Sequence, residues 1–291
     1  MTSPSRGRNS TGSSPDIEIL LHTARTAADA ATRVHRRHAG RVGVAEASEK
    51  GTSDFVSHVD LESQRAALQV IRERHPDHGI LAEEADDEGD EDEEEAEDGE
   101  DDVPLWIVDP LDGTTNFLNR HPMYCASVAV YRAGEPLAAA VGSSTTSERW
   151  WAGRNRGAFK DGRRIRVSPL EGLRHALVGT GFPFKALDEV PRYLDELGRV
   201  LRSTAGVRRG GSAALDLCYL ADGTFDGFWE RHLKPWDIAA GVLIVREAGG
   251  IVTRLDESEI DFRHPGDGTV LGANSPEMLR TLGNLLRESD S

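Results

Sequence analysis

The chain has 291 residues, a length that suffices for a large buried core. Its formal net charge of −16 at neutral pH argues against nucleic-acid binding through a basic surface. No apolar run approaches the roughly 20 residues of a membrane-spanning helix, so no membrane partner is predicted. The two cysteines, Cys125 and Cys218, stand far apart in no metal-like spacing, which predicts reduced, buried thiols in a cytoplasmic protein.

Most of the negative charge lies in one segment, residues 86–102, in which fourteen of seventeen residues are acidic. The rest of the chain, with a net charge of −2, is nearly balanced. A run of like charges repels itself and cannot be buried, so we predict a disordered acidic insertion. A second interpretation is a loop that collects cations or inhibits the protein, because the segment lies between two candidate metal-binding stretches.

Helical patterns follow a polar start. Residues 1–14 lack the apolar stretch of a secretory signal and are predicted to be a disordered tail. Apolar residues then recur at helical spacing up to about residue 34, and Pro15-Asp16 suits a helix start. A second helix is predicted from about Asp60, and Pro76 ends it.

Short strands are predicted at "GILAEE" and "LWIV", on either side of the acidic insertion. Two more strands flank a turn at Gly134, and Asp161-Gly162 is a strong hairpin signal. Further on, strands alternate with helices, and Ser275-Pro276 opens the last helix because Ser suits the N-cap and Pro the first helical position. The other helices of this part are predicted at roughly 187–203, 212–221 and 237–248. The pattern predicts one domain over residues 15–290, interrupted only by the acidic insertion.

The stretch "WIVDPLDGTTNF", residues 106–117, ends an apolar run with two aspartates, Asp109 and Asp112. Carboxylates at the end of a buried strand are costly unless a cation compensates their charge, and no Lys or Arg stands beside them. Hard oxygen ligands suit Mg²⁺ or Mn²⁺, and the Leu111 carbonyl could add another oxygen. The stretch is therefore a candidate metal site.

The residues after Asp112 offer backbone N–H groups. Gly113, Thr114 and Thr115 stand at a predicted helix start, where an anion such as phosphate is favoured. Metal ligands and a phosphate cradle would then lie within one turn of chain. Taken alone, the stretch also fits an ordinary Asp-Gly turn with Asp109 as a cap.

Three further acidic positions strengthen the metal interpretation. Glu83-Glu84 ends a short strand, Asp237 heads an apolar helix, and Asp54 precedes a short apolar pair. Taken one at a time, Glu83-Glu84 also fits a solvated surface pair, Asp237 a plain N-cap and Asp54 a turn residue. Together with Asp109 and Asp112 they could hold two or three divalent ions, which is the chemistry of phosphate-ester hydrolysis.

These residues carry a family resemblance. "WIVDPLDGTTNF" and "WDIAAGVLIVREAGG" resemble the two signature motifs of the inositol monophosphatase family. "GTSDFVSHVD", "GILAEE", "GTGFPFK" and "GGSAALDLCYLADGTFDGFWE" resemble its bacterial inositol-1-monophosphatase branch in the same order. The resemblance covers roughly residues 15–290. It implies an α+β fold, a five-layered αβαβα sandwich of the inositol monophosphatase and fructose-1,6-bisphosphatase type, with Mg²⁺-dependent hydrolysis of phosphate monoesters, Li⁺ inhibition and a homodimer.

Matched residue by residue, the resemblance also implies individual roles. The ligands of two to three Mg²⁺ ions would be Glu83, Asp109, the Leu111 carbonyl, Asp112 and Asp237. Thr114 resembles the residue that orients the attacking water, supported by Asp54, which would also act through waters on a third ion. The substrate contacts would be Gly113, Thr114, Gly211, Ser212, Ala213, Glu230 and Asp237. Glu84 is expected to stand behind the ligands, and Ala85 departs from the family's usual Ser.

The leading expectation is hydrolysis of a small phosphate monoester, foremost myo-inositol-1-phosphate. Histidinol phosphate, fructose-1,6-bisphosphate and 3′-phosphoadenosine-5′-phosphate are alternatives that the same metal core could serve. An alternative of another class is a non-catalytic regulatory or binding protein on the same fold. Outside the motifs, Arg208 and Arg209 could bind an anionic substrate, form an oligomer contact or simply be solvated, whereas His121 fits a surface or packing histidine better than a catalytic one.

Overall fold

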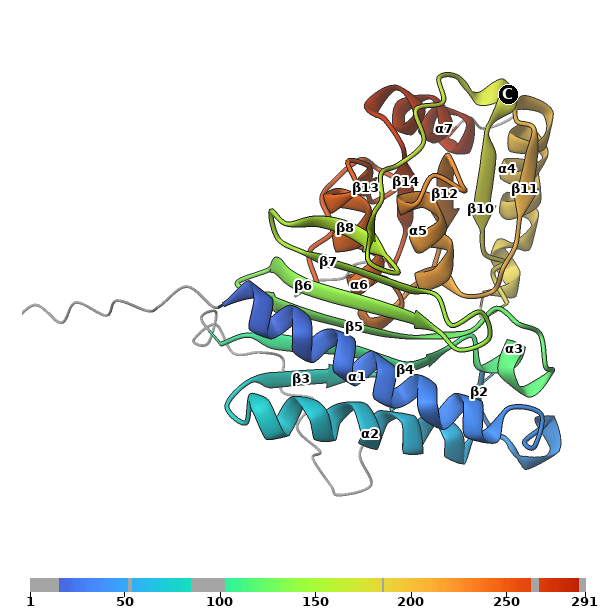
Figure 1. Ribbon diagram of the computed structural model, residues 1–291. Coiled ribbons are helices and arrows are strands. Elements are labelled where there is room, and N and C mark those ends of the chain that lie inside the picture. Colours follow the sequence, from blue (N-terminus) through green and yellow to red (C-terminus); the bar gives the residue numbers. More distant parts are fainter. Residues whose placement is uncertain (1–15, 52–53, 85–102, 185, 263–266, 288–291) are drawn as a thin grey trace, which may run out of the picture.

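The computed structural model describes residues 16–51, 54–84, 103–184, 186–262 and 267–287. The predicted tail, 1–14, and the acidic insertion, 86–102, lie outside the described residues, so their disorder stays a prediction. Within the described ranges the chain forms two mixed sheets, a two-stranded ribbon and seven α-helices (Figure 1). No helix of these ranges is both long and apolar enough to cross a membrane.

Two N-terminal helices form an outer layer on the larger sheet. α1 (Ile17–His38) begins as predicted at Asp16, whose side chain accepts the Glu18 N–H, and its small apolar residues pack on β5 and β6. α2 (His58–Arg74) begins at Ser57 in a capping box with Asp60 and packs on β4. The 3₁₀ turn η1 (Val44–Glu46) and the ribbon of β1 (Ser48–Gly51) and β2 (Asp54–Val56) connect the two helices.

The larger sheet follows the chain strand by strand. Its members, in sheet order, are β3 (Gly79–Ala82), β4 (Leu105–Asp112), β5 (Cys125–Arg132), β6 (Glu135–Ser143), β7 (Arg149–Gly153), β8 (Gly157–Lys160) and β9 (Arg163–Arg164). β3 and β4 are parallel, and the later neighbours are antiparallel. The predicted turns at Gly134 and Asp161-Gly162 are confirmed. The β4–β5 register shifts between Asp109 and Asp112, a local irregularity that leaves β4 bulged where the two aspartates stand.

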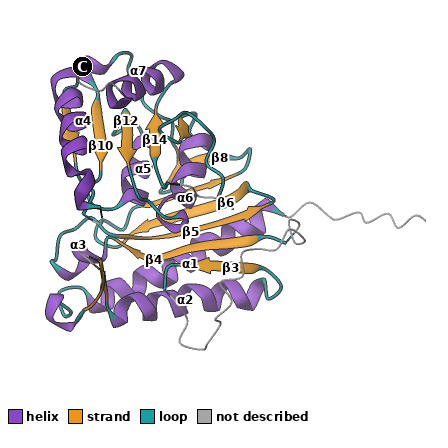
Figure 2. Ribbon diagram, turned by 180° about the vertical axis from the view of Figure 1, so that it is seen from behind, coloured by secondary structure: helices purple, strands orange, loops and turns teal. Residues whose placement is uncertain are grey.

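The second sheet is separated from the first by two buried helices, α5 (Ala213–Ala221) and α6 (Pro235–Glu247), as Figure 2 shows. Its strand order is β11 (Gly206–Arg208), β10 (Leu177–Thr180), β12 (Gly227–Glu230), β14 (Val270–Ala273) and β13 (Ile251–Thr253). α4 (Val190–Ser203) and α7 (Pro276–Arg287) cover its outer face. Short elements complete the described ranges: α3 (Thr114–Leu118), η2 (Leu173–His175) and η3 (Leu187–Glu189).

The layers therefore alternate helix, sheet, helix, sheet, helix, which confirms the predicted α+β sandwich. The predicted helix at 187–203 begins as the 3₁₀ turn η3 and continues as α4. β11 was not predicted, because three residues carry too little alternation and its pairing with β10 is a tertiary contact.

The contact between α5 and α6 depends on Gly241. A Cβ added at Gly241 would lie 2.6 Å from the Leu217 Cβ, which no real contact allows. We expect Gly241→Ala to lower the free energy of unfolding by about 1–3 kcal/mol through overpacking, although Ala is the better helix former.

A matched control stands in α4. A Cβ at Gly198 would meet only the end of the Arg202 side chain, at 3.4 Å. Gly198→Ala should therefore raise the free energy of unfolding by about 0.5–1 kcal/mol. Urea unfolding measures both variants, and shifts of the same sign would contradict the packing argument.

Candidate active site

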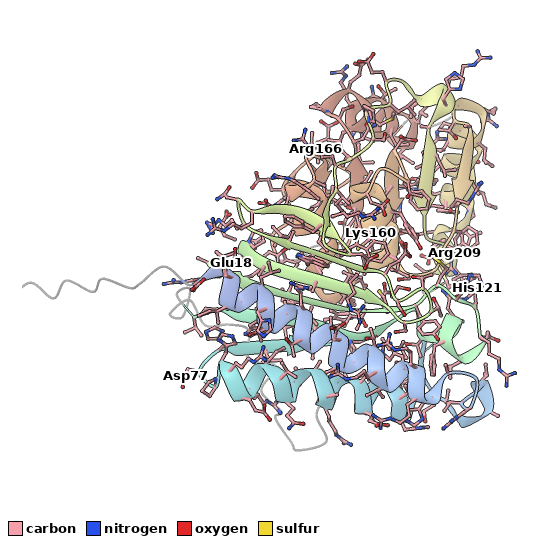
Figure 3. All side chains as sticks on the ribbon, in the orientation of Figure 1. Glu18, Asp77, His121, Lys160, Arg166 and Arg209 are labelled. Atoms are coloured by element: carbon pink, nitrogen blue, oxygen red, sulfur yellow. The ribbon has the colours of Figure 1, made fainter. Side chains whose placement is uncertain are left out.

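A cavity of about 370 Å³ is lined by the end of β4, the start of α3 and three segments of the second half of the chain. This volume is typical of small-molecule sites. The predicted site residues in its wall are Glu83, Asp109, Leu111, Asp112, Gly113, Thr114, Gly211, Ala213, Glu230 and Asp237. Arg209, which also lines it, lies at the end of the molecule where α3 approaches the second sheet (Figure 3). His121 is exposed and is not among the described lining residues.

Asp109 is the most deeply buried carboxylate of the cavity, with 1% of its surface exposed. Its Oδ1 accepts the Leu111 N–H at 3.0 Å, which fixes the side chain across the bulge. Burial, followed by the negative charges of Glu83, Asp112 and Asp237, raises the pKa of Asp109 well above its usual range. The four groups therefore act on one another strongly enough to favour a compensating cation.

The donor set fits a hard divalent cation, because it consists of carboxylates with a backbone carbonyl beside them. Among the described residues, no group of three or more His, Cys, Asp or Glu side chains is already arranged to hold a metal ion. The carboxylates of the cavity would therefore turn toward the ion when one binds. Mg²⁺ tolerates such a site because it commonly keeps several waters.

Asp112 is held by the segment that begins α5. Its Oδ2 accepts hydrogen bonds from the Ser212 hydroxyl at 2.5 Å and from the Ala214 N–H at 2.9 Å. Burial raises its pKa to about 6, although these hydrogen bonds lower it. With Oδ2 occupied, Oδ1 is the oxygen left to serve a ligand in the cavity.

Ser212, a predicted substrate contact, is the buried N-cap of α5, and its contact with a substrate stays a prediction. Ser212 is 1% exposed, accepts the Leu215 N–H as the N-cap of α5, and is not among the described lining residues. Its hydroxyl turns toward Asp112 because a cap side chain folds back over its own helix start. Ser212 thus positions a carboxylate of the cavity.

Thr114 makes a contact that the sequence did not predict. Its hydroxyl lies 2.8 Å from Asp60 Oδ1 and 3.1 Å from the Leu111 carbonyl. Asp60 is fully buried, and its other oxygen accepts the Ser57 N–H at 2.8 Å and the Ser57 hydroxyl at 2.7 Å. Burial raises the pKa of Asp60, while these hydrogen bonds oppose the rise. The first turn of α2 therefore reaches the cavity through Thr114.

Asp54, the predicted support of Thr114, opens β2, but its side chain lies outside the described residues. Its predicted role stays a prediction, and Asp60 is the described partner of Thr114. The signal for Asp60 was present as Ser57-x-x-Asp60, a capping pattern that fixes a carboxylate in a first helical turn.

The acidic pair at the end of β3 divides between two environments. Glu83 lines the cavity, and its N–H donates to the Val108 carbonyl beside Asp109. Glu84 is 5% exposed, and its backbone exchanges two hydrogen bonds with the Gln64 side chain, at 2.7 and 3.0 Å. Glu84 is buried and is not among the described lining residues, and its expected place behind the ligands stays a prediction.

Two acidic residues reach the cavity from the other side of the fold. Asp237 accepts the Lys234 N–H at 2.6 Å, so it caps α6 and lines the cavity at once. Glu230 ends β12 and fills the space beside Gly181, where an added Cβ would lie 1.7 Å from its Oε1. Burial, then the charges of Asp216, Asp237 and Asp112, raise the pKa of Glu230.

Asn116 joins the halves of the cavity and was not predicted. Its amide donates to the Met123 carbonyl at 2.6 Å and to the Gly210 carbonyl at 3.0 Å. These bonds tie α3 to the turn before α5. Its near-complete burial, with 8% exposed, distinguishes it from a surface amide, and burial of a single polar residue has no local signal in the sequence.

The bulge in β4 is supported from behind by a buried histidine of α1. His35 Nε2 lies 2.8 Å from the Pro110 carbonyl, and Nδ1 lies 2.7 Å from the Ser144 hydroxyl. Because a carbonyl only accepts, Nε2 carries the hydrogen and Nδ1 accepts from Ser144. Burial lowers the pKa of His35 to about 3, so the ring is neutral. It fixes the backbone between Asp109 and Leu111.

We expect His35→Phe to weaken Mn²⁺ or Mg²⁺ binding about 10- to 100-fold, because supports behind a ligand orient it. Isothermal titration calorimetry measures the affinity. His75→Phe is the control, since His75 contacts Thr23, at 3.1 Å, and does not line the cavity. Equal losses in both variants would point to general destabilisation.

The sequence profile of the inositol monophosphatase family matches residues 16–290. The putative Nus factor SuhB of Neisseria meningitidis serogroup B is 42% identical over 260 residues, which cover 89% of this chain and 95% of that protein. An inositol-1-monophosphatase of Rhizobium meliloti is 44% identical over 214 residues, covering 74% of this chain and 77% of that protein.

Solved structures are similar over nearly the whole chain. The extragenic suppressor protein suhB from Bartonella henselae has a TM-score of 0.82 and 34% identity, covering 94% of this chain and 100% of that one. The inositol monophosphatase from Anabaena has a TM-score of 0.77 and 32% identity, covering 93% and 95%. The names of the similar proteins thus differ: some are phosphatases, one is a Nus factor and one an extragenic suppressor protein.

Proposed function

The chain belongs to the inositol monophosphatase family, and we propose that it is a Mg²⁺-dependent phosphatase of small phosphate monoesters, foremost myo-inositol-1-phosphate. The observation that carries the proposal is the meeting of Asp109, Asp112 and Asp237 in one cavity beside the Thr114–Asp60 pair. These carboxylates, with Glu83 and the Leu111 carbonyl, would hold the two to three ions.

Bound Mg²⁺ would supply positive charge to phosphate oxygens and lower the pKa of a water molecule. The protein contributes orientation and a base. Because the Thr114 hydroxyl donates to Asp60, its oxygen lone pairs are free to accept a hydrogen bond from water in the cavity. Asp60 thereby polarises Thr114 and can receive the proton that passes through its hydroxyl.

The rest of the wall suits a phosphorylated polyol. Gly113 brings backbone close to the cavity, and a side chain there would collide with the Met123 carbonyl at 2.8 Å. Glu230 would offer carboxylate oxygens to ring hydroxyls, and the small Ala213 lines the same cavity. Glu230 therefore supports a hydroxylated substrate over an apolar one.

The test is phosphate release from a panel of esters, with Mg²⁺ and with EDTA. We expect Mg²⁺-dependent release that is strongest on myo-inositol-1-phosphate. Stronger release from histidinol phosphate, fructose-1,6-bisphosphate or 3′-phosphoadenosine-5′-phosphate would replace the substrate and keep the mechanism. No release from any ester, with Mg²⁺ bound, would contradict the phosphatase proposal.

The Nus factor names of several relatives support a second candidate, a regulatory or binding role on the same fold. The two candidates differ in their dependence on Asp109. A binding role should survive Asp109→Asn, whereas hydrolysis should not. Complementation of a deletion strain by this variant separates them.

We also propose a cytoplasmic homodimer. Leu194 and Leu201, seven residues apart on one side of α4, are 56% and 53% exposed, and Leu187 in the preceding turn η3 is 61% exposed. A second copy could cover this apolar line. The free, buried Cys125 and Cys218 suit a reducing compartment. Light scattering after size exclusion measures the mass of the assembly. The expected Li⁺ inhibition is tested separately, by adding Li⁺ to the phosphate-release assay.

A further inference from the structure

His232 lies in the cavity wall with its backbone in the left-handed region, at φ 61°. Among the described residues other than glycine that have a positive φ, it alone lines the cavity. A side chain is strained in this region, which glycine adopts freely. Strained residues of this kind concentrate at ligand sites, so the imidazole of His232 needs a functional explanation.

The chain is fixed on both sides of His232. Before it, Arg231 donates to the buried Glu196 at 2.5 Å. After it, the N–H of the buried Leu233 donates to the Gly268 carbonyl at 2.9 Å. A Cβ added at Gly268 would lie 2.4 Å from the Leu233 carbonyl oxygen, so the two backbones touch there. These contacts hold His232 in its strained conformation.

A carboxylate orients the imidazole of His232. Nε2 lies 3.3 Å from Oε2 of Glu189 in η3, and the His232 side chain is 36% exposed. The Glu189 oxygen is buried and has no hydrogen-bond partner among the described residues, and Glu189 is not among the described lining residues. Because a carboxylate oxygen only accepts, Nε2 carries a hydrogen toward Glu189. Nδ1 is then the nitrogen left for a ligand in the cavity.

The charges around His232 favour a hydroxyl over an anion as that ligand. Glu189 contacts the ring from one side, and Glu230 lines the same cavity two residues earlier in the chain. The neighbouring cation, Arg231, is already neutralised by its ion pair. A hydroxyl can donate to Nδ1 of a neutral imidazole or accept from Nδ1–H of a protonated one, so it suits either form of the ring.

We propose that His232, oriented by Glu189, binds a ring hydroxyl of the substrate beside the hydroxyls that Glu230 would hold. The inference rests on the proposed phosphatase function and assigns part of the preference for myo-inositol-1-phosphate to this side chain. His232 is then a specificity-determining residue that takes no part in the chemistry at phosphorus, and Glu189 is a positioning residue that acts through it.

The kinetic test compares myo-inositol-1-phosphate with cyclohexyl phosphate, which has the same six-membered carbon ring without hydroxyls. In His232→Gly the ratio of their kcat/KM values should fall about 3- to 10-fold, as one neutral hydrogen bond allows, and mainly through KM for the inositol ester. His232→Asn should restore part of the ratio, because asparagine tolerates the left-handed region and its amide can bind a hydroxyl. Glu189→Ala, which frees the ring, should lower the ratio by a smaller factor.

Ser147→Gly is the matched control. Ser147 has the same φ of 61°, is exposed and is not among the described lining residues. Both glycine variants should keep or raise the melting temperature, because glycine relieves the strained φ. Only His232→Gly should change the ratio of the two esters. A ratio that is unchanged in His232→Gly, or that falls equally in both variants, would overturn the inference.

A binding test does not depend on turnover. Calorimetry titrates each ester into the protein in the presence of Ca²⁺, a hard cation that carboxylates also hold. His232→Gly should bind myo-inositol-1-phosphate about 3- to 10-fold more weakly than wild type and cyclohexyl phosphate equally well. Equal binding of the inositol ester by both proteins would overturn the role of His232. Absence of phosphate release from either ester in Mg²⁺ would overturn the phosphatase proposal, and the binding difference would still decide whether His232 holds a hydroxyl.

Discussion

Asp109→Asn is expected to lower kcat by roughly a thousandfold or more, because it removes the negative charge of a proposed ligand and with it several kcal/mol of transition-state stabilisation. The same change should make the metal-free protein more stable at neutral pH. Asp109 is 1% exposed and stands among three carboxylates that raise its pKa together with burial. A residue that lowers stability and is required for activity is the signature of a functional site.

The stability effect has a definite pH dependence. A carboxyl whose folded pKa is raised binds more protons in the folded than in the unfolded protein, so stability falls as pH rises between the two values. For Asp112 that window runs from 3.8 to about 6. For Asp109 the shift is in the same direction. Asparagine does not ionise, so Asp109→Asn should lose less stability between about pH 4 and pH 7 than wild type.

Thermal unfolding in EDTA at pH 4 and at pH 7 measures this difference in stability between Asp109→Asn and wild type. Added Mg²⁺ should stabilise wild type more than Asp109→Asn. Asp226→Asn is the matched control. Asp226 is also buried, at 7% exposure, but it accepts the Leu177 N–H at 2.8 Å and the Ser168 hydroxyl and lies outside the cavity wall. The Asp226→Asn variant should lose about 1–3 kcal/mol of stability and keep its activity. If Asp109→Asn lost as much stability as Asp226→Asn, the neighbouring carboxylates would not be what destabilises Asp109 in the metal-free protein.

The layered fold was predictable because its signals are local and redundant. The Gly134 turn and the Asp161-Gly162 hairpin demand φ values that few other residues adopt, and both appear where predicted, with Asp161 at φ 49° and Gly162 at φ 79°. The carboxylates of the cavity were predictable for a related reason. A carboxylate at the end of a buried strand, such as Asp109, loses its hydration and needs a compensating partner in any fold.

Residues that act through other residues were harder to predict. Ser212 stands next to the site in sequence, yet its hydroxyl turns inward to Asp112 because it caps α5. His35 supports the β4 bulge from a helix 75 residues away, and its sequence context is that of any histidine on α1. Asp60 reaches Thr114 across 54 residues. Such contacts depend on how layers pack, and a local pattern does not encode them.

The Asp60–Thr114 contact leads to the second large effect. Asp60→Asn is expected to lower kcat by roughly 100- to 10,000-fold, as expected for loss of a general base, while Mg²⁺ affinity stays near wild type. The reason is a reversal of hydrogen-bond polarity. An asparagine would keep its oxygen on the Ser57 N–H, which now contacts Asp60 Oδ2 at 2.8 Å, and turn its NH₂ toward Thr114. Thr114 would then accept where it now donates, so one of its two lone pairs would be occupied and its hydrogen would no longer be directed at a base.

Two variants separate this effect from the capping role of Asp60. Ser57→Ala removes the cap hydroxyl, so it should cost about 1 kcal/mol of stability and little activity. Thr114→Ser keeps the hydroxyl and should retain most of the activity, whereas Thr114→Val should lose about as much as Asp60→Asn. Phosphate release under saturating Mg²⁺ measures all of them.

The double variant Asp60→Asn/Thr114→Val decides whether the two residues act as one unit. If Asp60 works through the Thr114 hydroxyl, removing both should cost little more than removing either, because the second change has nothing left to disturb. Losses that multiply would mean that the two side chains act on water independently. In that case the 2.8 Å contact would be structural, and the base would have to come from the carboxylates that surround Asp109.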